Sequence, residues 1–157
     1  MKKLNLFLGI VLVLLVGFVI YFFAGGALNA QVNVITAPAA EYPEAFASIQ
    51  NVLTSGSAPQ LFAADFPEDA ANYTLADITV TLANRGLFPA EWLDVTVTGV
   101  EGDVAVYSLT GEGSSIPALS TGQVNLKLIT SVSESVPREI TIRYYVFGMQ
   151  RTVRIAG

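Results

Sequence analysis

LADITVTLANRGLFPAEWLDVTVT, residues 75–98, alternates apolar side chains with threonine and charged side chains in two runs separated by a turn. Alternation with a period of two is typical of a β-strand that buries one face. The turn Asn84-Arg85-Gly86 lies between the runs, so the segment predicts two consecutive strands that share a core. The side chains expected to face inward are Ile78, Val80 and Leu82 in the first strand and Leu93, Val95 and Val97 in the second.

The alternation continues toward the C-terminus. Residues 104–109 predict a third strand, and a Gly/Ser/Pro loop at 111–118 precedes a fourth at 123–130. In that fourth strand Val124 and Leu126 alternate with polar neighbours. Several short strands, each with one apolar face, pack as two antiparallel sheets. We therefore expect a mainly β fold, an antiparallel β-sandwich, over residues 75–157.

The last two strands constrain their own pairing. If Gly148-Met149 is a two-residue turn with glycine first, the apolar side chains of both strands fall on one face. A one-residue slip would set Val153 and Ile155 opposite polar positions, so pattern and turn favour the same register. The pairs expected in that register are Phe147–Gln150, Tyr145–Thr152, Tyr144–Val153, Arg143–Arg154 and Ile142–Ile155.

Upstream, residues 4–24 read LNLFLGIVLVLLVGFVIYFFA. From Leu6 to Ala24 a helix spans roughly 28 Å at about 1.5 Å per residue, close to the hydrocarbon core of a bilayer at about 30 Å. Lysines stay on the cytoplasmic side, which predicts a cytoplasmic N-terminus and an extracytoplasmic C-terminal domain in the cell membrane. The expected anchor covers residues 1–27, and its key residues are Lys2, Lys3, Leu6, the interfacial Tyr21 and Ala24.

A cleaved signal peptide is the competing interpretation, since Gly25-Gly26-Ala27 and Ala30 are small enough for a peptidase. The apolar core exceeds the roughly 7 to 15 residues of such peptides, which favours a retained signal-anchor. Another alternative is a subunit of a surface filament or membrane complex that assembles through this helix. No acid precedes Glu41, so the sequence lacks the early glutamate of type IV pilins.

Residues 28–74 are expected to connect the anchor to the sandwich. Residues 31–36 alternate like a short strand, and a second strand is expected near residues 60–63. Pro43 suits the first position of a helix, and Phe46 and Ile49 recur at helical spacing. We expect a short amphipathic helix at residues 43–54.

Composition excludes several classes of function. Of the 8 basic and 13 acidic residues, Lys2 and Lys3 precede the apolar stretch; the exported part keeps 6 basic residues and a formal charge of −7. That charge argues against nucleic acid and predicts repulsion from an anionic membrane surface. The chain has no cysteine and no histidine, which argues against an enzyme and a cofactor. Asp65, Glu68 and Asp69 lack the spacing of a calcium loop, so a solvated loop is favoured.

The segments ITVTLANRG (78–86), LDVTVTG (93–99) and IPALSTG (116–122) resemble the CARDB- and NEW3-like Ig-like adhesion modules of bacterial and archaeal surface proteins. These modules are themselves similar to fibronectin type III sandwiches. The resemblance covers about residues 75–156 and implies an Ig-like fold that contributes binding or spacing without catalytic residues. A single copy on its own helix departs from the usual spacer arrangement.

Two places are candidates for partner binding. Strict alternation puts Trp92 on the outer side with Asp94, whereas Ig-like domains often bury a tryptophan here; a bulge near Glu91 would bury it, and burial is the favoured expectation. On the final hairpin, two opposed arginines need an acid such as Glu139 between them, and ordinary surface compensation is favoured over a binding patch. The candidate residues are Arg143, Tyr145, Phe147, Arg154 and, if exposed, Trp92.

The functional expectation follows from these parts. We expect a non-catalytic, membrane-anchored, extracytoplasmic Ig-like module that binds or scaffolds other components of the cell envelope. Its expected partners are the membrane, through the N-terminal helix, and an envelope protein or glycan. A homo-oligomer is compatible with the sequence.

Overall fold

The computed structural model of the chain describes residues 2–24, 28–56, 60–62, 69–108, 114–131 and 136–157. Two α-helices, two short 3-10 helices and eight strands occupy these ranges. In chain order they are α1 (Lys2–Ala24), β1 (Leu28–Pro38), η1 (Ala39–Glu41), α2 (Pro43–Thr54), β2 (Gln60–Leu61), η2 (Ala70–Asn72), β3 (Thr74–Asn84), β4 (Glu91–Val97), β5 (Asp103–Ser108), β6 (Thr121–Thr130), β7 (Glu139–Val146) and β8 (Met149–Ala156).

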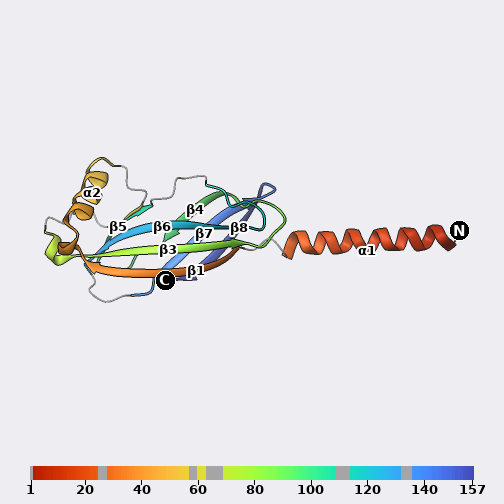
Figure 1. Ribbon diagram of the computed structural model, residues 1–157, viewed down its shortest axis with the longest axis horizontal. Coiled ribbons are helices and arrows are strands. Elements are labelled where there is room, and N and C mark those ends of the chain that lie inside the picture. The colour runs from red at the N-terminus through yellow and green to blue at the C-terminus, as the bar shows by residue number, and fades with distance from the viewer. Residues whose placement is uncertain (1, 25–27, 57–59, 63–68, 109–113, 132–135) are drawn as a thin grey trace.

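The strands form two antiparallel sheets that face each other (Figure 1). One sheet has the order β1-β3-β6-β5-β2 and the other the order β4-β7-β8. When the two-residue β2 is set aside, the seven remaining strands have the order of an immunoglobulin constant-type sandwich, in which the first, second, fifth and fourth strands face the third, sixth and seventh. The expected mainly β, two-sheet fold with an apolar N-terminal helix and one more short helix is confirmed.

The core lies between the sheets and includes most of the side chains that the alternation predicted. Ile78, Val80 and Leu82 of β3 are buried, and they pack with alternate residues of β6 and β7. Buried Tyr144 of β7 directs its hydroxyl to the backbone N–H of Leu28, which donates a hydrogen bond of 3.1 Å. The first residue of β1 is thereby fastened to the opposite sheet.

Residues 28–74, expected to connect the anchor to the sandwich, contribute two strands to it. The short strand expected at residues 31–36 is the middle of β1, which pairs with β3 along its whole length. Gln60 of β2 joins the two sheets on the other side: its side-chain amide donates to the Val97 carbonyl and accepts from the Val97 N–H at 3.0 Å. One glutamine side chain thus replaces a pair of strand hydrogen bonds between β2 and β4.

A second, smaller core lies under α2 on the outer side of the larger sheet. The helix begins at Pro43 and ends at Thr54, as the sequence predicted. Its buried Phe46 and Ile49 pack with Ala105 of β5 and Ile129 of β6. Both of these strand residues lie toward the end of the sandwich that holds Pro38, the last residue of β1. We call this end of the sandwich the far end.

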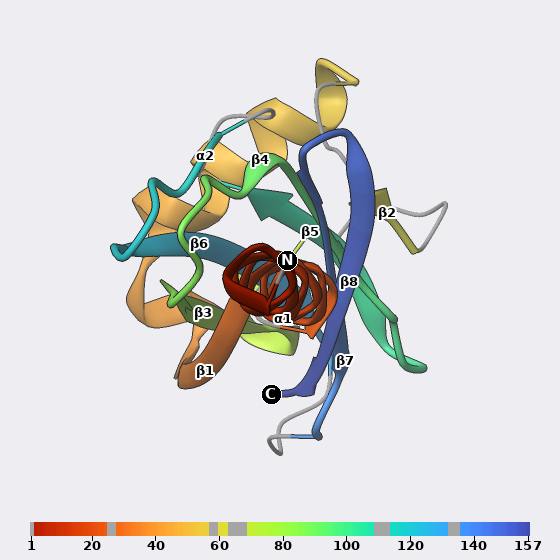
Figure 2. The same ribbon diagram turned by 90° about the vertical axis from the view of Figure 1, so that its right-hand side faces the viewer.

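At the opposite, near end, β1 begins with Leu28 opposite Asn84, the last residue of β3. Figure 1 shows α1 approaching this end of the sandwich, and Figure 2 looks along α1 onto it. The span Lys3–Tyr21 is long and apolar enough to cross a membrane, and none of it is buried against the other residues that the structure describes. These properties fit either a membrane anchor or a signal sequence.

The pairing expected for the last hairpin is wrong by two residues. Phe147-Gly148, not Gly148-Met149, is the two-residue turn, and Val146 pairs with Met149. Both turn residues have positive φ, 52° for Phe147 and 72° for Gly148, which defines a type I′ turn. A shift of two residues keeps every side chain on its expected face, so the buried set is unchanged.

Candidate functional site

The outer face of the β4-β7-β8 sheet carries three of the expected binding residues. Arg143 and Tyr145 of β7 and Arg154 of β8 are all exposed on it. The arginines do not oppose each other as expected: Arg143 lies opposite Thr152, and Arg154 lies opposite Thr141. The repulsion expected from a directly opposed pair is therefore absent.

Each arginine has an acidic neighbour near the outer distance limit of a salt bridge. The Arg143 guanidinium lies 3.7 Å from the Asp94 carboxylate, and that of Arg154 lies 3.9 Å from the Glu139 carboxylate. All four side chains are largely exposed, and pairs of this kind stabilise a fold by at most about 1 kcal/mol. Both guanidinium groups can therefore exchange their acid for an external carboxylate or hydroxyl at little cost.

Trp92 is exposed, and its expected burial is wrong. The expected bulge exists: between the pairs Glu91–Tyr145 and Asp94–Arg143, two residues of β4 face one residue of β7. Leu93 takes the inward position of the bulge, while Trp92 is the extra residue with φ 54° and 69% of its surface exposed. The bulge therefore presents the indole to solvent instead of turning it into the core.

Phe147 lies in the turn between β7 and β8 and not on the outer face of these strands. Its ring meets Phe88 edge to face, with 4.2 Å between ring centroids, and 60% of its surface remains exposed. The structure thus groups Arg143, Tyr145 and Arg154 on one face. It places Phe147 at the near end of the sandwich.

A buried ion pair lies at the far end, and the sequence interpretation missed it. Nε and Nη2 of Arg138 donate to the two carboxylate oxygens of Asp103 at 2.9 and 2.7 Å. The Val100 N–H donates a further hydrogen bond of 3.0 Å to Asp103. Burial raises the pKa of the Asp103 carboxyl, but the hydrogen bonds from Arg138 and Val100 outweigh it and hold the pKa below its usual 3.8.

The alternation of apolar residues indicates one member of this ion pair. Arg138 is in phase with Ile140 and Ile142, so the period of β7 directs its side chain inward. The identity of its partner could not be read from the sequence, because Asp103 comes from a strand start 35 residues earlier.

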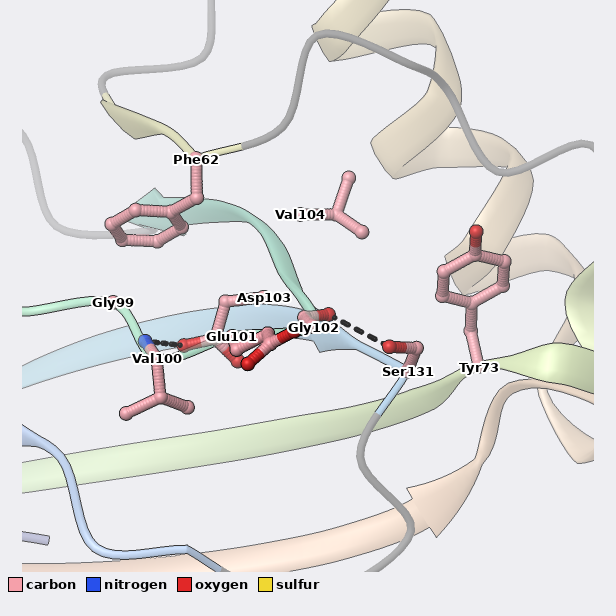
Figure 3. A pocket seen from close by; sticks show the side chains of 9 residues that line it. All are labelled: Phe62, Tyr73, Gly99, Val100, Glu101, Gly102, Asp103, Val104 and Ser131. Carbon is pink, nitrogen blue, oxygen red and sulfur yellow. Dashed lines mark hydrogen bonds between the residues drawn. The ribbon is translucent and has the colours of Figure 1, made fainter.

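A depression of about 480 Å³ lies beside this ion pair (Figure 3). Phe62 and Tyr73 border it, and its floor is the turn from Gly99 to Val104. The Asp103 carboxylate below is used by Arg138 and Val100, and the Gly102 carbonyl accepts from Ser131. In the described part of the chain no buried side-chain nitrogen or oxygen lacks a hydrogen-bond partner, so no buried polar group is left unpaired beside this depression.

The residues that the structure describes contain no group of three acidic side chains arranged to hold a metal ion. Of the acidic group considered for calcium, Asp65 and Glu68 lie outside the described residues. Asp69 caps η2, because its carboxylate accepts from the Ala71 N–H at 2.9 Å. Asp69 therefore has a local structural role.

The expected anchor residues all belong to α1, which runs from Lys2 to Ala24. Lys3 lies at its start, and the side chains of Leu6 and Tyr21 are exposed. Apolar residues surround this helix on every side, a pattern typical of a helix inside a protein core or a membrane. No part of the described chain supplies such a core.

Comparison with models of known protein families found no match, and comparison with curated protein sequences found none either. Among solved structures, a FixG-related protein from Vibrio parahaemolyticus is 11% identical, with a TM-score of 0.41, over 82% of this chain and 92% of that one. The structural genomics target SoR45 is 16% identical, with a TM-score of 0.42, over 80% and 81%. The cupredoxin domain of amoB from Nitrosocaldus yellowstonii is 11% identical, with a TM-score of 0.34, over 83% and 86%.

These neighbours are β-sandwich domains of low sequence identity. TM-scores below 0.5 do not assign the chain to a family. The strand order and the register of the chain itself define its fold.

Proposed function

We propose that the protein is a membrane-anchored extracytoplasmic Ig-like module that binds or scaffolds other components of the cell envelope and does not catalyse a reaction. The observation that carries this proposal is an apolar helix that no described part of its own chain covers, joined through three residues to a two-sheet sandwich. Such a helix needs an apolar surrounding, and a bilayer supplies one.

Lys2 and Lys3 at the start of α1 favour an N-terminus on the cytoplasmic side and a sandwich outside. The length of the apolar stretch favours a retained anchor over a cleaved signal. The mass of the protein purified from membranes tests retention: the full chain of 16.7 kDa is expected. A species shorter by the N-terminal segment would contradict a retained anchor.

The outer face of β4-β7-β8 is the proposed binding surface. Arg143, Arg154 and Tyr145 provide two planar cations and an aromatic ring on one face, a combination suited to carboxylates of a protein or to an acidic glycan. The resemblance to CARDB- and NEW3-like adhesion modules supports a binding role for this sandwich.

The test replaces both arginines, Arg143→Ala with Arg154→Ala. Because both ion pairs are exposed and long, we expect the free energy of unfolding to change by less than about 1 kcal/mol. Cross-linking to envelope partners from a photoreactive amino acid at Thr152, between the arginines on the same face, should fall in this variant. Urea unfolding and cross-linking in intact cells provide the two measurements.

A photoreactive group at Gln123, exposed on the outer face of β6, is the matched control. Equal cross-linking from both positions, or a large loss of stability in the arginine variant, would contradict a binding role for this face. Cross-links that join α1 of one copy to α1 of another would instead support the alternative of a subunit assembled through its helix.

A further inference from the structure

Four large apolar side chains are exposed at the near end of the sandwich, where α1 joins it. Leu87 follows β3, Leu119 precedes β6, Phe147 forms the β7–β8 turn, and Trp92 lies in the bulge at the start of β4. Their exposed fractions are 55%, 69%, 60% and 69%. We call these four residues the apolar rim.

Three of the four residues of the apolar rim have an unfavourable backbone conformation. Among the described residues, those other than glycine with positive φ are Trp92, Leu119 and Phe147, at 54°, 55° and 52°. A residue with a side chain occupies this region at a cost, which glycine or asparagine would avoid. Each of the three strained positions therefore carries a large apolar side chain that points outward.

Hydrogen bonds fix the two loops that carry Leu87 and Leu119. The side-chain amide of buried Asn84 donates to the carbonyls of Phe88, Ile116 and Pro117, and its oxygen accepts from the Gly86 N–H. The Leu119 N–H donates to the Gly86 carbonyl at 3.2 Å. Leu87 and Leu119 are thus held next to each other by one polar network.

The apolar rim is close to α1 by chain connectivity. Four residue steps separate Ala24 from Leu28, and an extended chain covers at most about 14 Å in four steps. Leu28 donates to the Tyr144 hydroxyl, three residues before Phe147. When α1 crosses a bilayer, this end of the sandwich lies at the headgroup region, whatever angle the sandwich adopts.

The charges of the sandwich are unevenly placed. Arg85 follows β3, Arg151 lies opposite Tyr144 and Glu91 lies opposite Tyr145, so two cations and one acid lie at the near end. Many of the acids lie toward the far end, among them Glu41, Glu44, Asp69, Asp77, Glu101 and Glu139. The repulsion from a membrane surface expected from the net charge therefore acts mainly on the far end, which is turned away.

We propose that the apolar rim inserts into the interfacial region of the bilayer that α1 crosses, so that the sandwich is held upright on the membrane. Indole and phenyl rings favour this layer, and aliphatic side chains gain from leaving water there. The inference rests on the proposed function, since the bilayer is the one that α1 occupies.

Trp92 reports on this contact directly, because it is the one tryptophan in the chain. The full chain is reconstituted in phosphatidylcholine vesicles that contain lipids brominated near the headgroup end of the acyl chains. We expect the emission of Trp92 to shift to the blue and to be quenched by the brominated lipid. Replacing Leu87 and Leu119 together by serine should weaken the quenching.

The control moves the tryptophan to the far end of the same chain, as Trp92→Phe with Tyr42→Trp. Tyr42 is 52% exposed, follows η1 and shares the same tether. Quenching of Trp92 without quenching at position 42 supports the proposal. Equal quenching at both positions, no quenching of Trp92, or a blue shift without quenching would overturn it, the last because it indicates contact between protein chains.

Flotation of the same vesicles separates this inference from the proposed function. Protein that floats with the vesicles and shows unquenched Trp92 is anchored but not docked, and only the inference fails. Protein that does not float is not anchored, and both fail.

Discussion

At the scale of single residues, the pair Asp103–Arg138 is the strongest polar determinant of stability. Both side chains are buried, and the contact is bidentate. Removing one charge from such a pair leaves the other buried without its partner, which costs about 3–5 kcal/mol. We expect Asp103→Asn to lower the free energy of unfolding by about this amount in urea titrations at neutral pH.

The double variant Asp103→Asn with Arg138→Met is the control, because it removes both charges. It should be clearly more stable than Asp103→Asn alone. If the single and double variants lose the same free energy, the pair is not coupled and its assigned role is wrong.

The same carboxyl predicts an acid dependence. Its pKa is lower in the folded protein than the ordinary 3.8, so the stabilisation is complete above that value and is lost as the pH falls through the folded pKa. The wild-type protein should lose stability below pH 3.8 more steeply than Asp103→Asn, which has no carboxyl to protonate. Parallel acid profiles of the two proteins would contradict the lowered pKa.

Arg138 and Trp92 define what a single sequence can reveal at this scale. The alternation of β7 directs Arg138 inward, but only the fold brings Asp103 to it. A bulge near Glu91 was predictable from the conflict between alternation and a bulky aromatic. Which residue of the bulge turns outward depends on the backbone, and Leu93 takes the core position instead of Trp92.

At the scale of elements, the β7–β8 hairpin carries avoidable strain in its turn. Both residues of a type I′ turn need positive φ, and Asn-Gly is the preferred pair. Phe147→Asn removes the strain, whereas Phe147→Ala removes the same ring contact with Phe88 and keeps the strain. We expect Phe147→Asn to be more stable than Phe147→Ala by roughly 1 kcal/mol. It should therefore unfold at a higher temperature. Equal stability of the two variants would show that the turn is not strained.

The hairpin also shows how far alternation determines a fold. A slip of one residue exchanges the buried and exposed faces, so the pattern excludes it. A slip of two residues preserves the faces, and only the turn distinguishes the two registers. The observed turn is Phe147-Gly148, with glycine as its second residue. Glycine was expected as the first residue of the turn, and this register was therefore missed.

The contact between β2 and β4 depends on one side chain. Gln60→Ala removes both part-buried hydrogen bonds to the backbone of Val97. Each such bond contributes about 1 kcal/mol, and more when a partner is left unsatisfied. We expect a loss of roughly 1–3 kcal/mol and faster hydrogen exchange of the Val97 N–H. Gln123→Ala, on the exposed face of β6, should change neither. Unchanged exchange at Val97 in Gln60→Ala would contradict the bridge.

At the scale of the whole molecule, sequence and structure agree on the parts and differ on where they join. Strand alternation, the apolar stretch and Pro43 predicted the sandwich, α1 and α2. The sequence did not reveal that residues 28–38 are a full-length strand of the sandwich, because β1 is an edge strand in which Leu28 alone is buried and the alternate residues are only partly buried. This strand brings the near end of the sandwich within four residue steps of α1.

The central claim is that α1 crosses a membrane and holds the sandwich outside. The chain has no cysteine, so single-cysteine variants can be labelled without background. Intact cells that produce Thr152→Cys or Lys3→Cys are treated with a membrane-impermeant maleimide, and the protein is recovered from the membrane fraction. The account predicts that Thr152→Cys is labelled in intact cells and Lys3→Cys only after permeabilisation; labelling of Lys3→Cys with protection of Thr152→Cys would contradict it.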